Sequence, residues 1–294
     1  MRWFKLEVER RFNFKLTIYP SFTLAFYSVE DGLYRKIIGL KGAFRVCGGD
    51  LYYYGFSVDE ALKLSGAWFN PLQKASGLTS RVYSRIKPIL EAYGCVGLAI
   101  DPYDKPWVFT TVALSRTTDF HTNVIGWVKK LFREAGDPRL IDENVACRVG
   151  GSFQIRQLPA QVRGYFRVRD WRLSIDEARV ALQSIHGVGP KVATAYLLYT
   201  RPEASLLAPV DIHFRRFVDK LGILDYKIPW NPSLCSRYKC VDCPARSGCL
   251  HWIARSELGP LAGWVQTISY IHDKLYCSRS ACGTCPLRSL CTSC

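Results

Sequence analysis

The chain has 294 residues, 48% of them hydrophobic, which is enough to bury the core of one large or two modest domains. No run approaches the roughly 20 apolar residues of a membrane span, and the charged first residues are unlike a signal peptide, so we expect no membrane partner. Lysine and arginine outnumber aspartate and glutamate by 40 to 25, and the formal charge of +15 favours a polyanionic partner.

The N-terminal part of the chain has the pattern of an antiparallel sheet. In residues 11–19 (RFNFKLTIY), apolar and polar side chains alternate, which predicts a strand with one buried face. Shorter β-type runs follow at 33–40, 43–47 and 51–56, separated by turns that contain glycine. We therefore expect an N-terminal β-sheet region over residues 1–79.

From residue 57 onward the spacing of apolar residues becomes helical. We predict helices over 80–93, 106–133, 175–185, 191–200, 211–221 and 256–275. The predicted fold class is α+β, with a mainly helical core over 80–276 that contains a four-cysteine insertion at 235–249, and a C-terminal loop over 277–294.

Residues 182–197 (LQSIHGVGPKVATAYL) place a tight turn between two short helices. Gly187 and Gly189, on either side of Val188, permit positive φ and leave backbone amides bare at the start of the second helix, where they can hold a phosphate. Such a contact carries no sequence information, which suits a protein that scans nucleic acid. An ordinary connection between two helices is the alternative.

This hairpin, the lysine that follows it and the stretch PVDIHFRRF (209–217) resemble the helix-hairpin-helix DNA glycosylase superfamily. The resemblance implies that Lys191 is the nucleophile of a glycosylase that is also an AP lyase, and that Asp211 assists loss of the base. It also implies that His213 contacts a phosphate. The resemblance covers about residues 100–294, and we expect a monomer that binds double-stranded DNA containing a damaged base.

The chemistry of an amine nucleophile agrees with this placement. A free lysine amine is neutral in less than about one part in a thousand at pH 7, and only the neutral amine attacks. Lys191 begins a helix, where the positive end of the helix dipole and apolar neighbours both disfavour the ammonium form. The alternatives are that Lys191 holds a phosphate as a point charge and that Asp211 only caps a helix.

Residues 259–266 (GPLAGWVQ) resemble the last pocket helix of the eukaryotic-type 8-oxoguanine DNA glycosylases. By this resemblance Gln266 reads the edge of a flipped base and Tyr270 replaces an aromatic that stacks on it. The chain departs from the family at three positions. Phe22 replaces a glycine whose carbonyl reads the oxidised purine, Ala195 replaces a cysteine that sandwiches the base, and Thr118 is nearest to the asparagine that fills the vacated stack. A plain core helix is the alternative.

The stretch GYFRVRDW (164–171) resembles the segment that supplies an arginine to the orphaned partner base, which makes Arg167 and Arg169 candidates, with simple phosphate contacts as the alternative. We expect a glycosylase and AP lyase that excises a damaged purine, with 8-oxoguanine as the first candidate. The alternatives are an enzyme for alkylated or deaminated bases, an endonuclease III-like enzyme for oxidised pyrimidines, and a non-catalytic helix-hairpin-helix DNA-binding protein.

The cysteines form a second pattern. Twelve cysteines in a reducing compartment favour metal or cluster ligands over disulfides, and eight of them form two copies of C-x4-C-x2-C-x5-C. The C-terminal copy resembles the [4Fe–4S] site of endonuclease III, whose first gap is two residues longer. We expect two [4Fe–4S] clusters, with a structural zinc at one site as the alternative. The predicted ligands are Cys277, Cys282, Cys285 and Cys291 in the C-terminal copy, and Cys235, Cys240, Cys243 and Cys249 in the insertion.

The remaining cysteines, at positions 47, 95, 147 and 294, are expected to be core residues or bystanders. We expect an intracellular protein of the cytoplasm or nucleoid. The low numbers of asparagine (five) and glutamine (six) also fit a thermophilic archaeon as the source, and a basic thermophile surface is the alternative explanation for the basic surplus.

Overall fold

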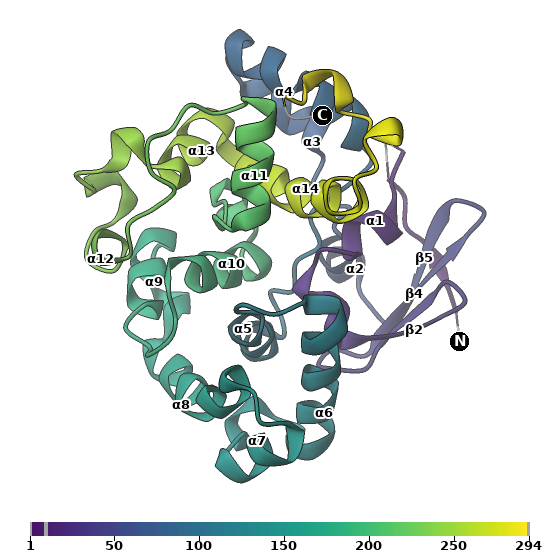
Figure 1. Cartoon of the computed structure of the whole chain (residues 1–294). Helices are drawn as coiled ribbons and strands as arrows, with labels where there is room; N and C mark the ends of the chain where they lie inside the picture. Colours follow the sequence, from purple (N-terminus) through teal and green to yellow (C-terminus); the bar gives the residue numbers. More distant parts are fainter. Residues whose placement is uncertain (1, 9–10, 293–294) are drawn as a thin grey trace.

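The computed structural model describes residues 2–8 and 11–292 and combines a five-stranded antiparallel sheet with a larger helical part (Figure 1). The α+β fold class is therefore confirmed. The strands are β1 (Phe4–Lys5), β2 (Tyr27–Glu30), β3 (Leu33–Lys36), β4 (Gly42–Cys47) and β5 (Asp50–Tyr54). The α-helices are α1 (Phe14–Ile18), α2 (Val58–Ser65), α3 (Pro71–Lys74), α4 (Ser80–Tyr93), α5 (Lys105–Leu114), α6 (Ile125–Ala135), α7 (Glu143–Val149), α8 (Phe153–Val168), α9 (Ile175–Leu182), α10 (Pro190–Thr200), α11 (Ile212–Leu221), α12 (Pro232–Cys235), α13 (Leu250–Leu258) and α14 (Ala262–Leu275).

The sheet has the order β1-β5-β4-β3-β2, and three of the predicted β-type runs supply β3, β4 and β5. Its inner face packs on the helical part through buried residues such as Phe44, which opposes Tyr53 across the β4–β5 ladder. The ammonium group of Lys36 is buried in β3 and pairs with Asp101 at 3.0 Å and with Asp104. Because Asp104 lies at the start of α5, this ion pair joins the sheet to the helices that carry the site.

The strand predicted over residues 11–19 is wrong, because the segment contains helix α1. Asn13 caps this helix: its Oδ1 atom accepts from the Leu16 amide at 3.0 Å. The buried positions are Phe14, Thr17 and Ile18, which is the i, i+3, i+4 spacing of a helix face. Thr17 counts as polar in an alternating pattern, but its hydroxyl is satisfied by the Asn13 carbonyl at 2.8 Å and is buried.

Two of the predicted helices are interrupted. The segment 106–133 breaks after α5 and resumes, through a π-turn over Phe120–Val124, as α6. Thr117 has φ +52° in this break, and Asp119 caps the turn by accepting from the Thr122 amide at 2.8 Å. The segment 256–275 is divided at Gly259, where φ is +51°, into α13 and α14. The loop at the first of these breaks points into the pocket described below.

Helices α7 and α8 have no counterpart in the predictions. α8 carries Pro159 in its interior, a residue that weakens a helix pattern in the sequence. Tertiary contacts compensate, because the Tyr165 ring stacks on Phe109 of α5 with centroids 4.5 Å apart. Helices α4, α9, α10 and α11 were predicted at their observed positions to within a few residues, whereas α2, α3 and α12 lie outside the predicted helix ranges.

Buried polar contacts and one glycine hold α10 and α14, the two helices that carry most of the site. Arg201, directly after α10, pairs with Asp170 at 3.0 Å in the interior, and Tyr196 of α10 donates to the same carboxylate at 3.1 Å. Gly263 of α14 lies so close to α10 that an added Cβ atom would be 2.4 Å from Leu198. This close approach sets the two helices side by side.

Candidate active site

The hairpin predicted from the sequence joins α9 to α10. Gly187 has φ +77°, and the turn closes through a 2.9 Å bond from the Val188 amide to the Ile185 carbonyl. Arg116 donates to the Gly187 carbonyl at 2.8 Å, which fixes the turn against the break after α5. Within the part of the chain that the structure describes, the amides of Gly187 and Gly189 have no hydrogen-bond partner. They are therefore available to a phosphate.

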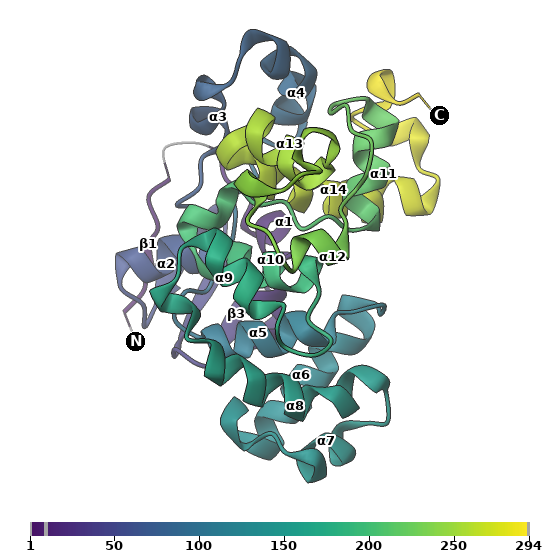
Figure 2. The same cartoon turned by 90° about the vertical axis from the view of Figure 1, so that its left-hand side faces the viewer.

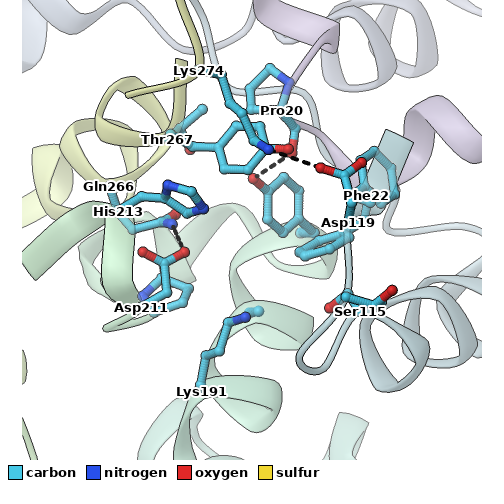
Figure 3. A pocket seen from close by; sticks show the side chains of 16 residues that line it. Pro20, Phe22, Ser115, Asp119, Lys191, Asp211, His213, Gln266, Thr267 and Lys274 are labelled. Carbon is cyan, nitrogen blue, oxygen red and sulfur yellow. Dashed lines mark hydrogen bonds and ion pairs between the residues drawn. The ribbon is translucent and has the colours of Figure 1, made fainter. Parts of the chain in front are cut away.

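Lys191 lies in the first turn of α10, and its amine points into a pocket (Figure 3). The pocket lies where α10, α11, α14 and the break between α5 and α6 meet. Its lining residues are Pro20, Phe22, Ser115, Thr118, Asp119, Phe120, Lys191, Ala195, Tyr199, Pro209, Asp211, His213, Gln266, Thr267, Tyr270 and Lys274. The structure thus brings both predicted catalytic residues to one pocket.

Asp211 caps α11 and faces the pocket with both carboxylate oxygens occupied. Its Oδ1 atom accepts from the Phe214 amide at 2.8 Å, and its Oδ2 atom accepts from Gln266 Nε2 at 3.1 Å (Figure 3). The capping bond leaves the carboxylate facing the pocket, so capping does not exclude the catalytic role predicted for Asp211. The bond from Gln266, which the sequence does not predict, connects the predicted base reader to the predicted catalytic carboxylate.

Three buried polar atoms around the pocket have no hydrogen-bond partner within residues 2–8 and 11–292. They are Gln266 Oε1, the Tyr270 hydroxyl and His121 Nε2. Burial raises the pKa of the Tyr270 hydroxyl well above its usual range, so the phenol stays protonated. Burial also lowers the pKa of His121, so its imidazole, which stacks on Tyr19 at 4.3 Å, is neutral at pH 7. Since buried polar atoms are rarely left unpaired, these three atoms are available for hydrogen bonds to ordered water or to a bound ligand.

An ion pair at the mouth of the pocket was not predicted. Lys274 of α14 donates to Asp119 Oδ2 at 2.9 Å, and its amine lies 5.7 Å from the centre of the Tyr270 ring. The hydrogen bond from Lys274 holds the pKa of Asp119 well below its usual range. One signal was present in the sequence, because Gln266, Tyr270 and Lys274 recur at intervals of four, which places them on one face of a helix.

The residues at which the chain departs from the family pattern also lie in the pocket. Phe22 is packed edge-on against Phe120 at 5.4 Å and Tyr199 at 5.1 Å, which makes one wall aromatic. Ala195 is buried in α10 and leaves space where a longer side chain would stand. Thr118 accepts from Asn123 Nδ2 at 2.9 Å, so an asparagine does reach this loop, five residues further along the chain.

His213 and the two arginine candidates occupy different surroundings. His213 lines the pocket, and its Nδ1 atom lies 2.6 Å from Asp273 Oδ2, which fixes the orientation of the ring. Arg167 and Arg169 are exposed at the C-terminal end of α8, away from the pocket lining. Their roles stay predictions.

The two cysteine blocks differ in burial. In the insertion, Cys235, Cys240 and Cys249 are buried and Cys243 is half-buried, and all four line one small cavity together with Arg179. The four C-terminal cysteines are half-buried. Among the described residues, no three metal-ligating side chains stand close enough to share a single ion. Cys294 lies outside the described residues.

No protein-family model matches the sequence, and no curated protein matches it either. Every helix in the described ranges is too short or too polar to span a bilayer. Solved structures do match. The first is MBOgg1 in complex with a low-affinity DNA ligand, with a TM-score of 0.67 and 18% identity over 94% of this chain and 99% of that one.

Two further solved structures match over most of their length and of this chain. The Clostridium acetobutylicum 8-oxoguanine glycosylase/lyase, in complex with double-stranded DNA containing cytosine opposite 8-oxoguanine, matches with a TM-score of 0.64 and 14% identity over 94% of this chain and 98% of that one. The 3-methyladenine DNA glycosylase of Archaeoglobus fulgidus matches with a TM-score of 0.64 and 13% identity over 93% and 98%. The chain therefore has the fold of the helix-hairpin-helix DNA glycosylases, as its hairpin motif predicted.

Proposed function

We propose that this protein is a DNA glycosylase with AP lyase activity that excises a damaged purine, first of all 8-oxoguanine, from double-stranded DNA as a monomer. The observation that carries the proposal is the meeting of Lys191 and Asp211 in one pocket beside the hairpin (Figure 3). The formal charge of +15 and the free amides of the hairpin suit a phosphate backbone. A DNA-binding protein without catalysis has no need of a lysine and a carboxylate together in a pocket.

In this mechanism Lys191 Nζ attacks C1′ of the flipped nucleotide, the bond from C1′ to the base breaks, and the base leaves with the bonding electrons and takes up a proton. The carboxylate of Asp211 stabilises the positive charge that develops on the sugar, and its two hydrogen bonds hold it in place. The lysine nitrogen then expels the ring oxygen to give a protonated imine. Loss of a proton from C2′ lets the 3′ phosphate leave, and water releases the enzyme.

The pocket suits a base that offers both hydrogen-bond donors and a flat face. Gln266 Oε1 is an unpaired acceptor for an N–H group of the base, and the Tyr270 hydroxyl both donates and accepts. A guanine-type edge supplies both kinds of group. By the family resemblance, Phe22 stands where a backbone carbonyl reads the oxidised purine. Phe22, Phe120 and Tyr199 instead form an aromatic wall. Because positively charged rings are attracted to aromatic faces, this wall makes alkylated bases the second candidate substrates.

The C-terminal cysteines, on this proposal, hold a [4Fe–4S] cluster through Cys277, Cys282, Cys285 and Cys291. The residues present fit such a group, because four thiols follow one another in the spacing C-x4-C-x2-C-x5-C directly after α14, and Cys285 Sγ lies 3.6 Å from His272 Nε2. A bound cluster supplies four covalent anchors for this loop. The exposed side chains of Arg279 and Arg288 would then be positioned for DNA phosphates.

Trapping with borohydride tests the nucleophile. Incubation with a panel of duplexes that carry oxidised, alkylated or deaminated bases should give a covalent protein–DNA adduct with the true substrate, and Lys191→Gln should abolish it. Lys274→Gln is the matched control, since Lys274 is the other lysine that lines the pocket. An adduct that survives in Lys191→Gln and disappears in Lys274→Gln would place the nucleophile on α14. Excision without any adduct would leave a glycosylase that lacks the lyase step.

A further inference from the structure

Arg179 of α9 is the most deeply buried arginine of the described chain that lacks a carboxylate partner. Its side chain is 1% exposed. Its guanidinium donates to the carbonyls of Cys235 at 3.0 Å and Tyr238 at 2.8 Å, while Nε has no partner. The nearby Asp176 pairs instead with Arg255 at 2.7 Å. A buried charge without a counter-charge is costly, so this position indicates a missing anion.

The cavity that Arg179 lines is also lined by all four cysteines of the insertion. The imidazole of His251 also lines the cavity. Its Nδ1 atom donates to the Ala208 carbonyl at 2.9 Å, and its buried Nε2 atom has no partner among the described residues. No carboxylate is among the described residues that line this cavity. The wall thus offers sulfur and nitrogen electron pairs together with one buried cation, Arg179, and one exposed cation, Arg246. Thiols carry no charge until a metal displaces their protons, after which four thiolates and a metal carry net negative charge.

We propose that the insertion holds a metal centre bound by the thiolates of Cys235, Cys240, Cys243 and Cys249, and that the buried guanidinium of Arg179 is its counter-charge. The four thiols can hold either an iron–sulfur cluster or a single zinc ion, and metal analysis distinguishes the two. This inference rests on the fold and the cavity and not on the proposed reaction.

The centre would also brace the DNA-binding hairpin. Gln183, at the end of α9, donates to the Cys235 carbonyl at 2.9 Å, and Glu177 of α9 pairs with Lys239 at 2.8 Å. With the two bonds of Arg179, these contacts attach the insertion to the first helix of the hairpin, and α12 lies beside α9 and α10 in both views (Figure 1, Figure 2). Cys235 and Lys191 even line one small cavity. A metal centre here would hold the base of the hairpin in a fixed position.

Metal analysis of the whole chain, prepared without oxygen, tests the site. The double variant Cys240→Ser/Cys243→Ser should lose either about four irons with their sulfides or about one zinc per chain, which distinguishes a cluster from a single ion. Cys282→Ser/Cys285→Ser serves as the comparison for the other block, and the exposed pair Cys47→Ser/Cys147→Ser should lose no metal. If Cys240→Ser/Cys243→Ser keeps all the metal of the parent, the site does not exist. Glycosylase activity does not enter this measurement.

Thermal unfolding tests the counter-charge. Arg179→Met should lower the Tm of the metal-loaded protein at least about twice as much as it lowers the Tm of the Cys240→Ser/Cys243→Ser variant. In that variant there is no anionic centre for the guanidinium to balance. Arg246→Met is the matched control, because Arg246 lines the same cavity but is exposed, and it should change the Tm little. Equal losses from Arg179→Met in the two backgrounds would show that Arg179 only bonds to carbonyls and would overturn its assignment.

Discussion

Replacing Gln266 by glutamate tests the contact that connects the base pocket to the proposed catalytic carboxylate. Gln266 Nε2 donates to Asp211 Oδ2 at 3.1 Å, and the glutamine side chain is 6% exposed. Glutamate has the same shape, so Gln266→Glu puts a carboxylate oxygen where the amide nitrogen lies. Two unit charges 3.1 Å apart repel by about 5 kcal/mol at an effective dielectric constant of about 20. Because Asp211 is half-buried and water screens part of this repulsion, we expect about 2 kcal/mol.

The sign of the effect with pH follows from the like charges. The repulsion raises the pKa of the introduced carboxyl above its unfolded value of about 4.3. Below about pH 4 the protonated carboxyl donates to Asp211 as the amide does, and the variant should be nearly as stable as the parent. The penalty grows as the pH rises above about 4.3 and is complete once the pH exceeds the raised pKa, which is about 6 for a penalty of about 2 kcal/mol.

Urea unfolding between pH 4 and pH 8 measures this penalty. Gln266→Leu is the control, since it loses the same hydrogen bond without adding a charge, and its deficit should depend little on pH. The informative quantity is the difference in free energy of unfolding between the Glu and Leu variants. A difference that stays flat from pH 4 to pH 8 would mean that residue 266 does not face Asp211, and the coupling between base reading and catalysis would have to be abandoned.

Three other changes probe the frame around the pocket. Gly187→Ala should lower the free energy of unfolding in urea by more than about 1 kcal/mol, because φ is +77° and an added Cβ would lie 2.6 Å from a glutamine nitrogen. The control Gly189→Ala, where an added Cβ meets open space, should change it by no more than about 0.5 kcal/mol. Lys274→Met should cost about 1 kcal/mol or less at pH 7; since Lys274 lowers the pKa of Asp119, that deficit should shrink as the pH falls below about 4. Asp170→Asn should lower the free energy of unfolding by about 3 kcal/mol or more, because the buried Arg201 loses its counter-charge. A decrease below about 1 kcal/mol in thermal or urea unfolding would contradict this.

Local sequence signals predicted the hairpin and the two residues, Lys191 and Asp211, that lie at helix starts beside it. The hairpin was predictable because Gly187 supplies the positive φ of the turn and the apolar residues on each side have helical spacing. Lys191 and Asp211 were predictable as a pair because each lies at a helix start and their motif is specific. The structure adds a hydrogen bond from Gln266, the predicted base reader, to Asp211.

The sequence patterns of the mispredicted segments, residues 11–19 and 106–133, are compatible with more than one secondary structure. Over nine residues, an alternating pattern and a helical one share most of their apolar positions, and the cap at Asn13 and the burial of Thr17 decide for the helix. The break between α5 and α6 was hidden by the continuous apolar pattern on both sides of it. That break matters for function, because it carries Thr118 and Asp119 into the pocket.

What no local pattern reveals is which polar atoms remain without partners after folding. Asp119 and Lys274 are 155 positions apart and meet only because the break in the helix faces α14, so their charges are already satisfied by each other. Gln266 Oε1, the Tyr270 hydroxyl and His121 Nε2 lie in the same region and are not satisfied. Since an unpaired buried polar atom costs about 1–3 kcal/mol, a ligand that bonds to Gln266 Oε1 and the Tyr270 hydroxyl, the two of these atoms whose side chains line the pocket, would offset part of that cost. A flipped base, as in the proposed reaction, presents several hydrogen-bonding groups on one rigid edge and can satisfy both an amide acceptor and a phenol.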